Sequence, residues 1–317
     1  MDILNSLQGV QENVPISNYV TFKIGGPARY FFVAKNKEEI ISAIKAAKEF
    51  NIPFYIIGGG SNLLVSDAGF NGLIIKIQTA GFQIQDTKII ADAGVSLSRL
   101  VIESVNAGLS GLEWAMGIPG TIGGAVYGNA GAYGHSISES IEKVTTISSL
   151  DYSIKEYDRN GCGFVYRGSA FKKINEIIVD MALIFKEGDK NECQKKIREA
   201  IDHRKTKTPP YPSAGCPFKN YRLKSKNPEE DPLVKKFPEL NGKIRAGKIG
   251  VGYMIDGCGL RGRQIGQAMV SHQHGNWIVN LGGATAKDVM ELITVVKEEV
   301  KEKWGIELEE ETRFLGF

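Results

Sequence analysis

The apolar positions of the N-terminal region follow a helical pattern and then two strand patterns. Apolar residues recur at three- and four-residue intervals after Asn36, which is followed three residues later by Glu39 as in a helix cap. This spacing predicts an amphipathic helix over 37–50. The short apolar runs at 54–57 and 73–77, separated by glycines and a polar turn, predict two buried strands.

Two later segments also have helical spacing. Residues 96–108 begin with Ser96 at a capping position and end in a glycine, which predicts a second helix. Near the C-terminus, Thr285 precedes an apolar stripe that continues to position 303, and Asp288 lies in the first turn. This pattern predicts a capped helix over about 286–303.

Strand patterns and one connector complete the outline. Apolar runs at 143–149 and 176–185 predict short strands, and the alternating segment 306–316 predicts a last strand. The polar stretch after residue 185 predicts a helix, which ends in an extended, proline-stiffened connector near 205–212. Helices and strands in this irregular order indicate an α+β protein.

Composition and charge narrow the class of protein. The chain has 317 residues, 42% of them hydrophobic and 24% charged, so it exceeds the usual size of a single core. Its net charge is only +3, with both signs scattered, which argues against a nucleic-acid binder. No window is apolar enough for a membrane span and the start shows no signal-peptide pattern, so we expect a cytoplasmic enzyme with no membrane partner.

The metal-ligating residue types are dispersed. The four cysteines lie far apart with no C-x-x-C pair, which suggests neither a zinc site nor a disulfide framework. His272 and His274 would share one face of a strand, but no third ligand is close in sequence. We therefore expect no metal.

Two glycine-rich segments carry the strongest chemical signal. The first, "IIGGGSNLL", follows a strand but lacks both the G-x-G-x-x-G spacing of a Rossmann site and the Gly-Lys-Ser/Thr ending of a Walker loop. Consecutive glycines can turn several backbone N–H groups toward one anion, although a tight turn between strands is the simpler reading. A second glycine-rich segment at 111–134 favours a pair of backbone cradles for an extended, phosphate-containing ligand.

Six motifs, in this order and spacing, extend over nearly the whole chain. They are "NYVTFKIGGPARYF", "IIGGGSNLLVSDAGFNG", "GIPGTIGGAVYGNAGAYG", "GFVYRGSAFK", "YPSAGCPFKN" and "IELEEETRFLG". Together they resemble the UDP-N-acetylenolpyruvoylglucosamine reductase family. The resemblance implies a two-lobed FAD-binding domain of the vanillyl-alcohol-oxidase (PCMH) type over 1–200, with subdomains of about 1–78 and 79–200. A smaller α+β substrate-binding domain would follow over 201–317.

By this resemblance the protein is a flavoenzyme of peptidoglycan precursor synthesis. NADPH would reduce a non-covalently bound FAD, which would pass hydride to C3 of the enolpyruvyl group of a UDP-sugar. The residues implied in FAD binding are Ile57, Gly58, Gly59, Gly60, Ser61, Asn62, Gly117, Ile118, Pro119, Gly120, Thr121, Gly123, Gly124, Asn129, Ala130 and Gly131. Tyr133 is expected to bind substrate, as are Lys219 and Asn220, because a lysine beside an amide suits a diphosphate or carboxylate, although both could equally be solvated loop residues.

The resemblance also singles out three catalytic residues. Arg167 would stabilise the enolate-like species formed by hydride addition, although spacing alone suggests a surface arginine. Cys216 matches the position of a serine proton donor; a lone cysteine is more often a buried filler, but a thiol titrates near ~8.5 and is the better acid. Glu311 would position that acid or stabilise the intermediate, whereas period-two alternation alone places it on a solvated strand edge.

Two departures and two alternatives remain from the sequence. Only 49 positions separate Arg167 from Cys216, which resembles the shorter branch of the family. The segment 221–245 is longer than usual, and its charges and prolines predict an exposed excursion. A different FAD-dependent oxidase of the same cofactor fold, or a non-enzymatic nucleotide-binding module, would also carry both glycine segments. The oligomeric state is left open.

Overall fold

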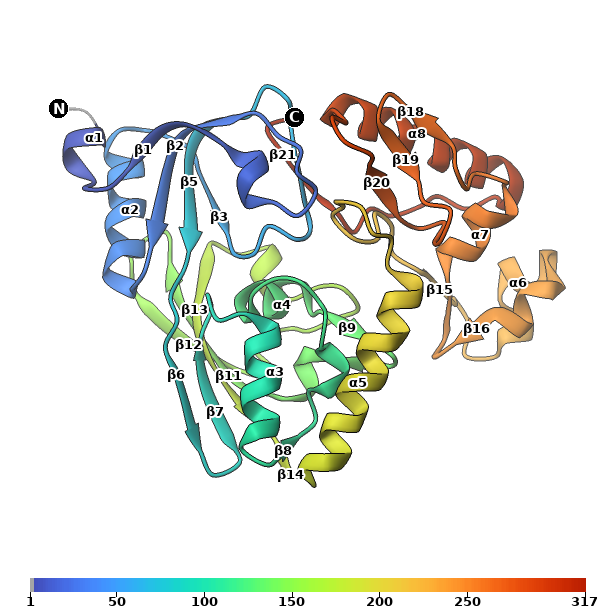
Figure 1. Cartoon of the computed structure of the whole chain (residues 1–317), viewed down its shortest axis with the longest axis horizontal. Helices are drawn as coiled ribbons and strands as arrows, with labels where there is room; N and C mark the ends of the chain where they lie inside the picture. The colour runs from blue at the N-terminus through green and yellow to red at the C-terminus, as the bar shows by residue number, and fades with distance from the viewer. Residues whose placement is uncertain (1–2) are drawn as a thin grey trace. The chain divides into compact units, whose positions relative to one another are not determined.

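A computed structural model describes residues 3–317, which form a mixed α+β protein (Figure 1). The chain divides into two compact units. The first consists of Met1–Val14, Pro27–Gly60 and Phe70–Thr206, and the second of Pro15–Gly26, Ser61–Gly69 and Lys207–Phe317. The second unit thus includes two segments from the first 70 residues, which a single division at residue 200 would assign to the N-terminal domain.

The first sheet of the first unit is mainly parallel. Its order is β1-β2-β5-β3, and the bounds are Gln11–Pro15, Pro27–Ala34, Phe70–Ile77 and Phe54–Ile57. Both β2 and β3 pair with β5 in parallel, and helix α2, Lys37–Glu49, connects β2 to β3 (Figure 1). A short helix α1, Ile3–Ser6, precedes β1. The strand predictions for 54–57 and 73–77 are confirmed, the second strand beginning three residues earlier.

Helix α2 forms where its sequence pattern predicts. The Asn36 side chain accepts a hydrogen bond from the Glu39 N–H at 2.8 Å, and the Glu39 carboxylate accepts one from the Lys35 N–H at 2.7 Å. These bonds satisfy donors that a helix N-terminus leaves open. Ile40 and Ile44 are fully buried in the apolar core that they share with residues of β2 and β5.

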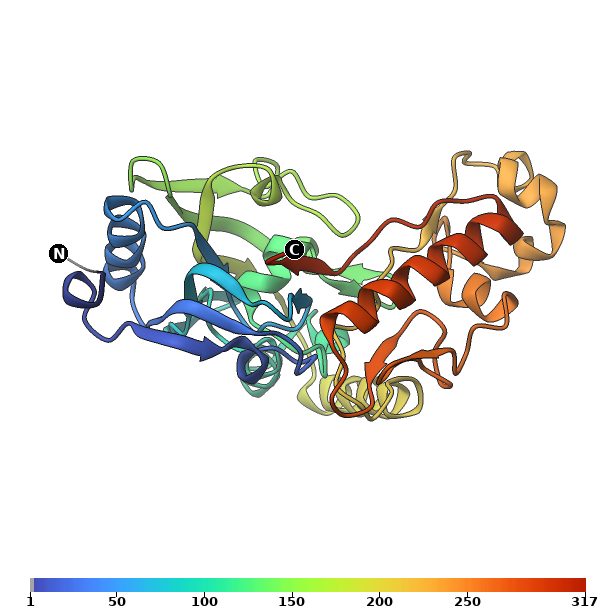
Figure 2. The same cartoon turned by 90° about the horizontal axis from the view of Figure 1, so that it is seen from above.

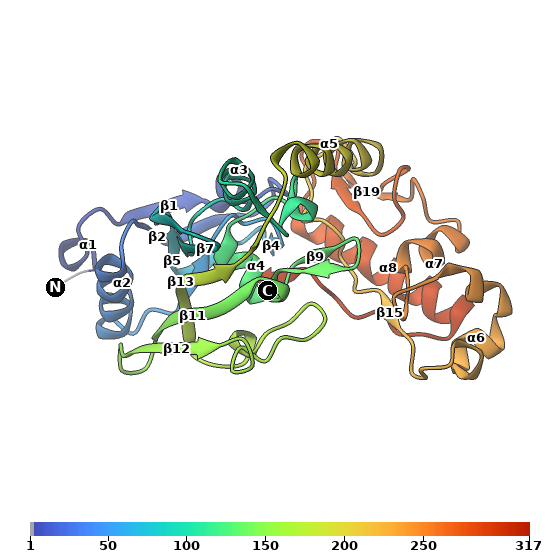
Figure 3. The same ribbon diagram turned by 90° about the horizontal axis from the view of Figure 1, so that it is seen from below.

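The second sheet of the first unit is antiparallel. Its order is β12-β11-β13-β7-β6, and the bounds are Ile154–Asp158, Ile141–Ser148, Glu176–Ile184, Lys88–Asp92 and Phe82–Gln85. Figure 3 shows β11 between β12 and β13. Two-stranded pairs β8–β14 and β9–β10 lie at Leu109–Ser110 with Lys186–Glu187 and at Gly131–Ala132 with His135–Ser136. One continuous apolar cluster contains buried residues of both large sheets.

Three helices accompany this sheet: α3 at Leu97–Asn106, α4 at Ile122–Gly128 and α5 at Lys190–Lys207. The helices predicted at 96–108 and before the connector at 205–212 are therefore present. Ser96 is the N-cap residue of α3, but the predicted capping by its side chain is wrong. The Ser96 side chain accepts no capping hydrogen bond. The Leu97 N–H, at the first helical position, bonds the Gly120 carbonyl at 3.1 Å, so a tertiary contact satisfies one of the open donors of the helix N-terminus.

The second unit has its own apolar core around helix α8, Ala286–Trp304. Figure 2 shows α8 beside the small sheet β18-β19-β20, whose strands are Gln264–Ile265, Ala268–Val270 and Ile278–Asn280. Helix α7 spans Val251–Gly257. The predicted cap is confirmed, because Thr285 and Asp288 form a capping box.

The last predicted strand is mostly wrong. Only Arg313–Leu315 form a strand, β21, which pairs in parallel with β4 at Leu63–Val65. Before it, residue 310 makes a single bridge to Phe218. The Glu311 N–H bonds the Pro217 carbonyl at 2.7 Å, so this backbone is held by a neighbouring loop and not by a strand ladder.

The excursion 221–245 is mostly exposed, as predicted, and it is also folded. It contains β15, Tyr221–Arg222, helix α6, Pro232–Lys236, and β16, Ile244–Arg245; β15 and β16 flank β17, Lys248–Ile249. Leu233, Val234 and Leu240 are buried in the second core. The fully buried Asp231 accepts hydrogen bonds from the Tyr221 hydroxyl at 3.1 Å and from the Lys224 N–H at 2.7 Å. The lysines, arginines and glutamates of this segment are exposed, unlike Asp231, and its few apolar residues anchor it.

No helix within residues 3–317 has the length and apolar character needed to cross a membrane.

Candidate functional site

The two glycine-rich segments of the first unit touch each other. A Cβ atom on Gly58 would lie 2.4 Å from the Thr121 hydroxyl oxygen, and one on Gly59 would lie 2.5 Å from the Gly120 Cα. Such distances exclude any side chain at these two positions. Gly60 follows with φ of +62°, a conformation that glycine adopts without strain. The sequence therefore uses glycine here for close approach of two backbones.

A lysine lies beneath the first glycine segment. The Lys76 ammonium, from β5, donates a hydrogen bond to the Gly58 carbonyl at 3.0 Å. Burial lowers the pKa of this lysine from its ordinary value. Lys76 is the one charged residue of β5, and this charge within the apolar run 73–77 is the sequence feature that marks it; it lies opposite Ile57 of β3, which is itself 3% exposed.

The second glycine segment is fixed to the turn between β7 and α3. The Ile122 N–H bonds the Val95 carbonyl and the Gly123 N–H bonds the Ala93 carbonyl, both at 2.9 Å. The Thr121 hydroxyl accepts from the Gly124 N–H at 3.3 Å and caps α4. These three hydrogen bonds, from the N–H groups of residues 122 to 124, hold the glycine-rich start of α4 in place.

Asn129 connects this segment to the turn that carries Arg167. It ends α4 in the left-handed region, with φ of +43°, and is 7% exposed. Its side-chain amide donates to the Val165 carbonyl at 2.9 Å and its oxygen accepts from the Ser138 N–H at 3.4 Å. Val165 and Gly168 exchange two backbone hydrogen bonds, which closes a tight turn.

Arg167 occupies a strained position in that turn. Its φ of +56° is uncommon for a residue with a side chain and costs on the order of 1 kcal/mol. The Lys172 ammonium donates to the Arg167 carbonyl at 2.7 Å, and the guanidinium lies 5.4 Å from the Tyr166 ring centroid. A half-buried arginine held in this conformation differs from the flexible surface arginine that spacing alone suggests.

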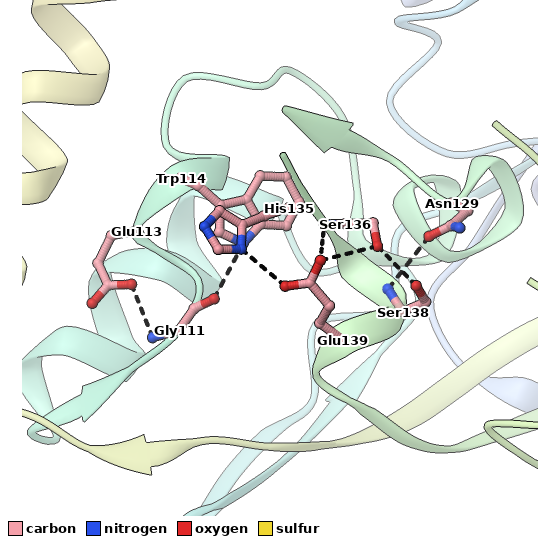
Figure 4. A network of polar contacts seen from close by, with 8 residues as sticks. All are labelled: Gly111, Glu113, Trp114, Asn129, His135, Ser136, Ser138 and Glu139. Atoms are coloured by element: carbon pink, nitrogen blue, oxygen red, sulfur yellow. Dashed lines mark hydrogen bonds and ion pairs between the residues drawn. The ribbon is translucent and has the colours of Figure 1, made fainter. Parts of the chain in front are cut away.

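Two carboxylates, one before and one after helix α4, form polar contacts that Figure 4 shows. Glu113, 5% exposed, accepts from the Gly111 N–H at 2.9 Å and from the Ser110 hydroxyl at 2.8 Å. Burial opposes its ionisation, but hydrogen bonds from Cys193, Ser110 and backbone N–H groups outweigh that effect, so the pKa of Glu113 lies below its ordinary value.

Glu139 is the second carboxylate of the network. It accepts from the Ser136 N–H at 2.8 Å and lies 2.9 Å from Nδ1 of His135, whose ring stacks on Trp114 (Figure 4). Its partial burial acts against ionisation, but the hydrogen bonds from His135 and Ser136 lower the pKa of Glu139 overall. The two carboxylates therefore brace the backbone on either side of α4.

The remaining sequence-predicted residues of the first unit lie around this segment. Gly117 has φ of +78°, and the Ile118 N–H bonds the Ala115 carbonyl at 3.0 Å, with Pro119 next in the loop. The Ala130 N–H bonds the Ala125 carbonyl at 2.8 Å, and Gly131 begins strand β9.

Tyr133 lies at the turn between β9 and β10. It is 49% exposed, has φ of +55°, and its hydroxyl lies 3.1 Å from Nδ1 of His203 on α5. The tyrosine is therefore accessible, with its phenol directed at a helix that the sequence did not connect to it.

In the second unit, the segments of Cys216 and Glu311 lie side by side. The Pro217 carbonyl accepts from the Glu311 N–H at 2.7 Å, and the Lys219 N–H bonds the Glu309 carbonyl at 2.9 Å. Cys216 is half-buried. The structure thus brings together two of the three residues proposed for catalysis, and Arg167 belongs to the first unit.

The side-chain amide of a buried asparagine holds the loop that contains Cys216 through two hydrogen bonds. Asn276, 2% exposed, accepts from the Phe218 N–H at 3.3 Å and donates to the Phe218 carbonyl at 2.8 Å. One side chain therefore satisfies both backbone groups of a residue two positions from Cys216. Nothing in the sequence pattern distinguished Asn276, because it belongs to an irregular stretch with no helical or strand period.

Ser61 and Asn62 differ from the glycines that precede them, because both belong to the second unit. The Asn62 side chain donates to the Glu311 carbonyl at 3.0 Å, and its own carbonyl accepts from the Arg313 N–H at 3.1 Å. Asn62 therefore supports the Glu311 segment directly.

The two residues expected to bind substrate after Cys216 have structural partners. The Lys219 ammonium pairs with the Glu309 carboxylate, and the Asn220 side chain accepts from the Val251 N–H at 3.2 Å. Both side chains therefore also have a structural role.

The predicted strand for His272 and His274 is wrong. Both lie in an irregular loop between β19 and β20, where Nδ1 of His274 accepts from the Asn276 N–H at 3.1 Å. Burial lowers the pKa of His274. Within residues 3–317, no group of three or more His, Cys, Asp or Glu residues has the arrangement of a metal site.

Comparison with protein families gives two matches. Residues 28–150 match an FAD binding domain, and residues 206–315 match the C-terminal domain of UDP-N-acetylenolpyruvoylglucosamine reductase. Together the two matches extend over most of both units.

Similar whole proteins are also known. A UDP-N-acetylenolpyruvoylglucosamine reductase of Lachnoclostridium phytofermentans is 38% identical, covering 98% of this chain and 94% of that protein. One of Carboxydothermus hydrogenoformans is 39% identical, covering 97% and 94%. The crystal structure of the Thermus caldophilus enzyme (MurB) is similar with a TM-score of 0.77 and 35% identity, covering 96% of this chain and 98% of that one. The chain therefore belongs to the UDP-N-acetylenolpyruvoylglucosamine reductase family, with an FAD-binding domain of the PCMH type followed by the family's C-terminal domain.

Proposed function

We propose that this protein reduces UDP-N-acetylglucosamine enolpyruvate to UDP-N-acetylmuramate in peptidoglycan precursor synthesis, with NADPH as the reductant. Family membership over nearly the full length supports the reaction class. The observation that carries the proposal is the contact of Gly58 and Gly59 with Gly120 and Thr121 inside the FAD-binding domain. This contact sets two glycine-rich segments side by side, and the main-chain N–H groups of such segments suit a pyrophosphate.

The residues of the first unit fit an FAD. Close approach leaves no room for a Cβ at Gly58 or Gly59, and glycines offer only main-chain N–H groups as donors to a phosphate. Gly58 to Asn62 would hold the pyrophosphate, and residues 117–124 and 129–131 would line the rest of the cofactor. The Lys76 charge beneath Gly58 adds a positive field that favours a bound diphosphate. When bound, FAD would supply the redox chemistry, namely the transfer of hydride from NADPH to C3 of the enolpyruvyl group.

Arg167 has the role of stabilising charge. Hydride addition at C3 moves electrons toward the substrate carboxylate, and a fixed guanidinium stabilises that charge best when its position is set in advance. The tight turn, the left-handed φ and the Asn129 hydrogen bond to Val165 support such a fixed position. The same bond couples Arg167 to the segment proposed to line the cofactor.

Cys216 gives the proton. Its Sγ–H protonates C2, and the thiol must therefore be protonated at the working pH. Glu311, whose backbone bonds that of Pro217, positions this acid or stabilises the intermediate. Tyr133, Lys219 and Asn220 bind the UDP-sugar, with the Lys219 ammonium exchanging its Glu309 partner for a substrate anion.

An anaerobic two-step experiment tests the proposal. The purified flavoprotein is mixed with NADPH and the flavin absorbance is followed, and the enolpyruvyl sugar nucleotide is then added. We expect bleaching in the first step and full return of the colour in the second, with formation of UDP-N-acetylmuramate. A protein that is bleached but recoloured only by oxygen would instead be a flavin oxidase. A protein that binds no flavin would contradict the proposal entirely.

A further inference from the structure

We propose that Arg204 is a positioning residue for FAD binding, which fixes the loop Trp114–Gly117 to helix α5 through backbone carbonyls. The proposal rests on the proposed flavin site of the first unit and adds a residue to it. Arg204 and its basic neighbours Lys205 and Lys207 could be read from the sequence as contacts for nucleotide phosphates. The structure separates the arginine from the two lysines.

The guanidinium donates to two carbonyls of one loop. Nε of Arg204 bonds the Met116 carbonyl at 2.8 Å, and Nη2 reaches the Trp114 carbonyl at 3.5 Å. The same group lies 5.4 Å from the centroid of the Tyr133 ring. Two donors on one rigid plane can hold two carbonyls in a fixed relation, which a lysine ammonium on a flexible stem does not reproduce.

The aliphatic part of the Arg204 side chain also contacts the loop. A Cβ on Gly117 would lie 2.8 Å from Cδ of Arg204, and Gly117 has φ of +78°. The stem therefore packs directly on a glycine that has no space for a side chain. Two residues after Gly117, the chain reaches Pro119 and then Gly120, whose Cα approaches Gly59. Fixing the Met116 carbonyl thus fixes the entry of the loop that forms half of the proposed cradle.

Burial and charge agree with this assignment. Arg204 is half-buried, and burial lowers its pKa from the ordinary value, as expected for a guanidinium taken from water to bond neutral carbonyls. The adjacent Lys205 is exposed and only approaches Asp202 at 3.8 Å. Lys205 is therefore a matched control, one residue away with the same charge and no contact to the loop.

The test compares FAD binding by the apoprotein of the wild type, Arg204→Lys, Arg204→Met and Lys205→Met. Flavin fluorescence quenching gives each dissociation constant. We expect a weakening of about tenfold or more for both Arg204 variants and less than about twofold for Lys205→Met. Equal affinity of Arg204→Lys and the wild type would overturn the proposal, because it would show that charge alone suffices. Unchanged affinity in Arg204→Met would overturn it as well.

Hydrogen–deuterium exchange on the apoproteins provides a readout without cofactor. In Arg204→Lys, we expect faster exchange in peptides spanning 114–124 and unchanged exchange in α2, which Arg204 does not contact. Unchanged exchange across 114–124 would contradict the positioning role. A wild-type protein that binds no FAD but shows this exchange pattern would contradict the proposed function and leave the role of Arg204 in the loop intact.

Discussion

The two units of this protein assemble their proposed site residues in opposite ways. In the first unit the key positions are defined by missing side chains, because Gly58 and Gly59 permit a backbone contact that any Cβ would prevent. In the second unit they are defined by side chains, namely the Cys216 thiol and the Asn276 amide that holds Phe218. A cofactor that is held by its diphosphate requires backbone donors, whereas proton transfer requires a specific acid.

This difference determines which kind of substitution damages each unit. Adding an atom should be most harmful in the glycine segments, while removing one should be most harmful around Cys216. Substitutions in the second unit, other than at Ser61 and Asn62, should also leave flavin binding intact. The following predictions test this separation, beginning with the largest expected effect.

The largest effect is expected for Cys216→Ala. Removing the proposed proton donor should lower the rate of UDP-N-acetylmuramate formation by about 10³-fold or more, because an acid group positioned at C2 is lost. Stopped-flow measurement of NADPH-driven flavin reduction should give a rate close to that of the wild type. Cys258→Ala is the matched control, since Cys258 is the other half-buried cysteine of the second unit. Equal loss of both half-reactions in Cys216→Ala would argue against the assignment.

A smaller effect on the same step is expected for Arg167→Met. Loss of a fixed cation that stabilises developing negative charge typically costs about 10²- to 10³-fold. The rate of flavin reoxidation by substrate should fall by this amount, and FAD affinity should stay within about twofold of the wild type. Arg159→Met, in an exposed arginine of the same unit, should change neither quantity. A variant that loses FAD and not reoxidation would move Arg167 from catalysis to cofactor binding.

Asn276→Ala should affect stability more than any exposed position. It leaves the N–H and C=O of Phe218 without their partner in a buried site, which costs about 2–4 kcal/mol in the free energy of unfolding. Urea unfolding measures this loss. The substrate half-reaction should slow as well, because the Cys216 loop loses its anchor, while NADPH-driven reduction should not. Gln273→Ala, in an exposed residue of the same loop, is the control.

The smallest effect concerns pH and the first unit. Hydrogen bonds hold the pKa of Glu113 below its ordinary value of about 4.3 despite burial, so its ionised form stabilises the folded state. That contribution is fully present above about pH 4.3 and is lost as the pH falls through the lower folded-state pKa. Glu113→Gln should therefore cost about 1 kcal/mol at pH 7, and the difference from the wild type should shrink below pH 4. A difference that grows toward acid pH would contradict this sign.

The regular elements could be predicted from local sequence, because their signals are local. Asn36 with Glu39 and Thr285 with Asp288 cap helices whose buried stripes repeat at helical spacing. Ser96 shows the limit, since it occupies the N-cap position of α3 but its side chain accepts no capping hydrogen bond, which the sequence pattern does not reveal. The final strand failed because Pro217 and Asn62 bond the backbone that a ladder was expected to hold.

The site could be predicted only in part. Glycine runs are conspicuous, so both segments could be predicted to bind a cofactor, and Lys76 is marked only by its charge within an apolar run. Arg204 and Asn276 act through contacts that no sequence period reveals. Arg167, Cys216 and Glu311 were singled out by family motifs and not by physical pattern. The structure supplies part of the missing physical account by placing the backbones of Cys216 and Glu311 side by side.

The central claim is that the interlocked glycine segments of the first unit hold the flavin, and Gly59→Val tests it most directly. FAD titration of the apoprotein should show at least a hundredfold loss of affinity, because a Cβ at this position falls 2.5 Å from the Gly120 Cα. Gly128→Ala, where an added Cβ meets nothing within 4 Å, should bind FAD as the wild type does. A Gly59→Val protein that is folded and binds FAD with wild-type affinity would contradict the claim.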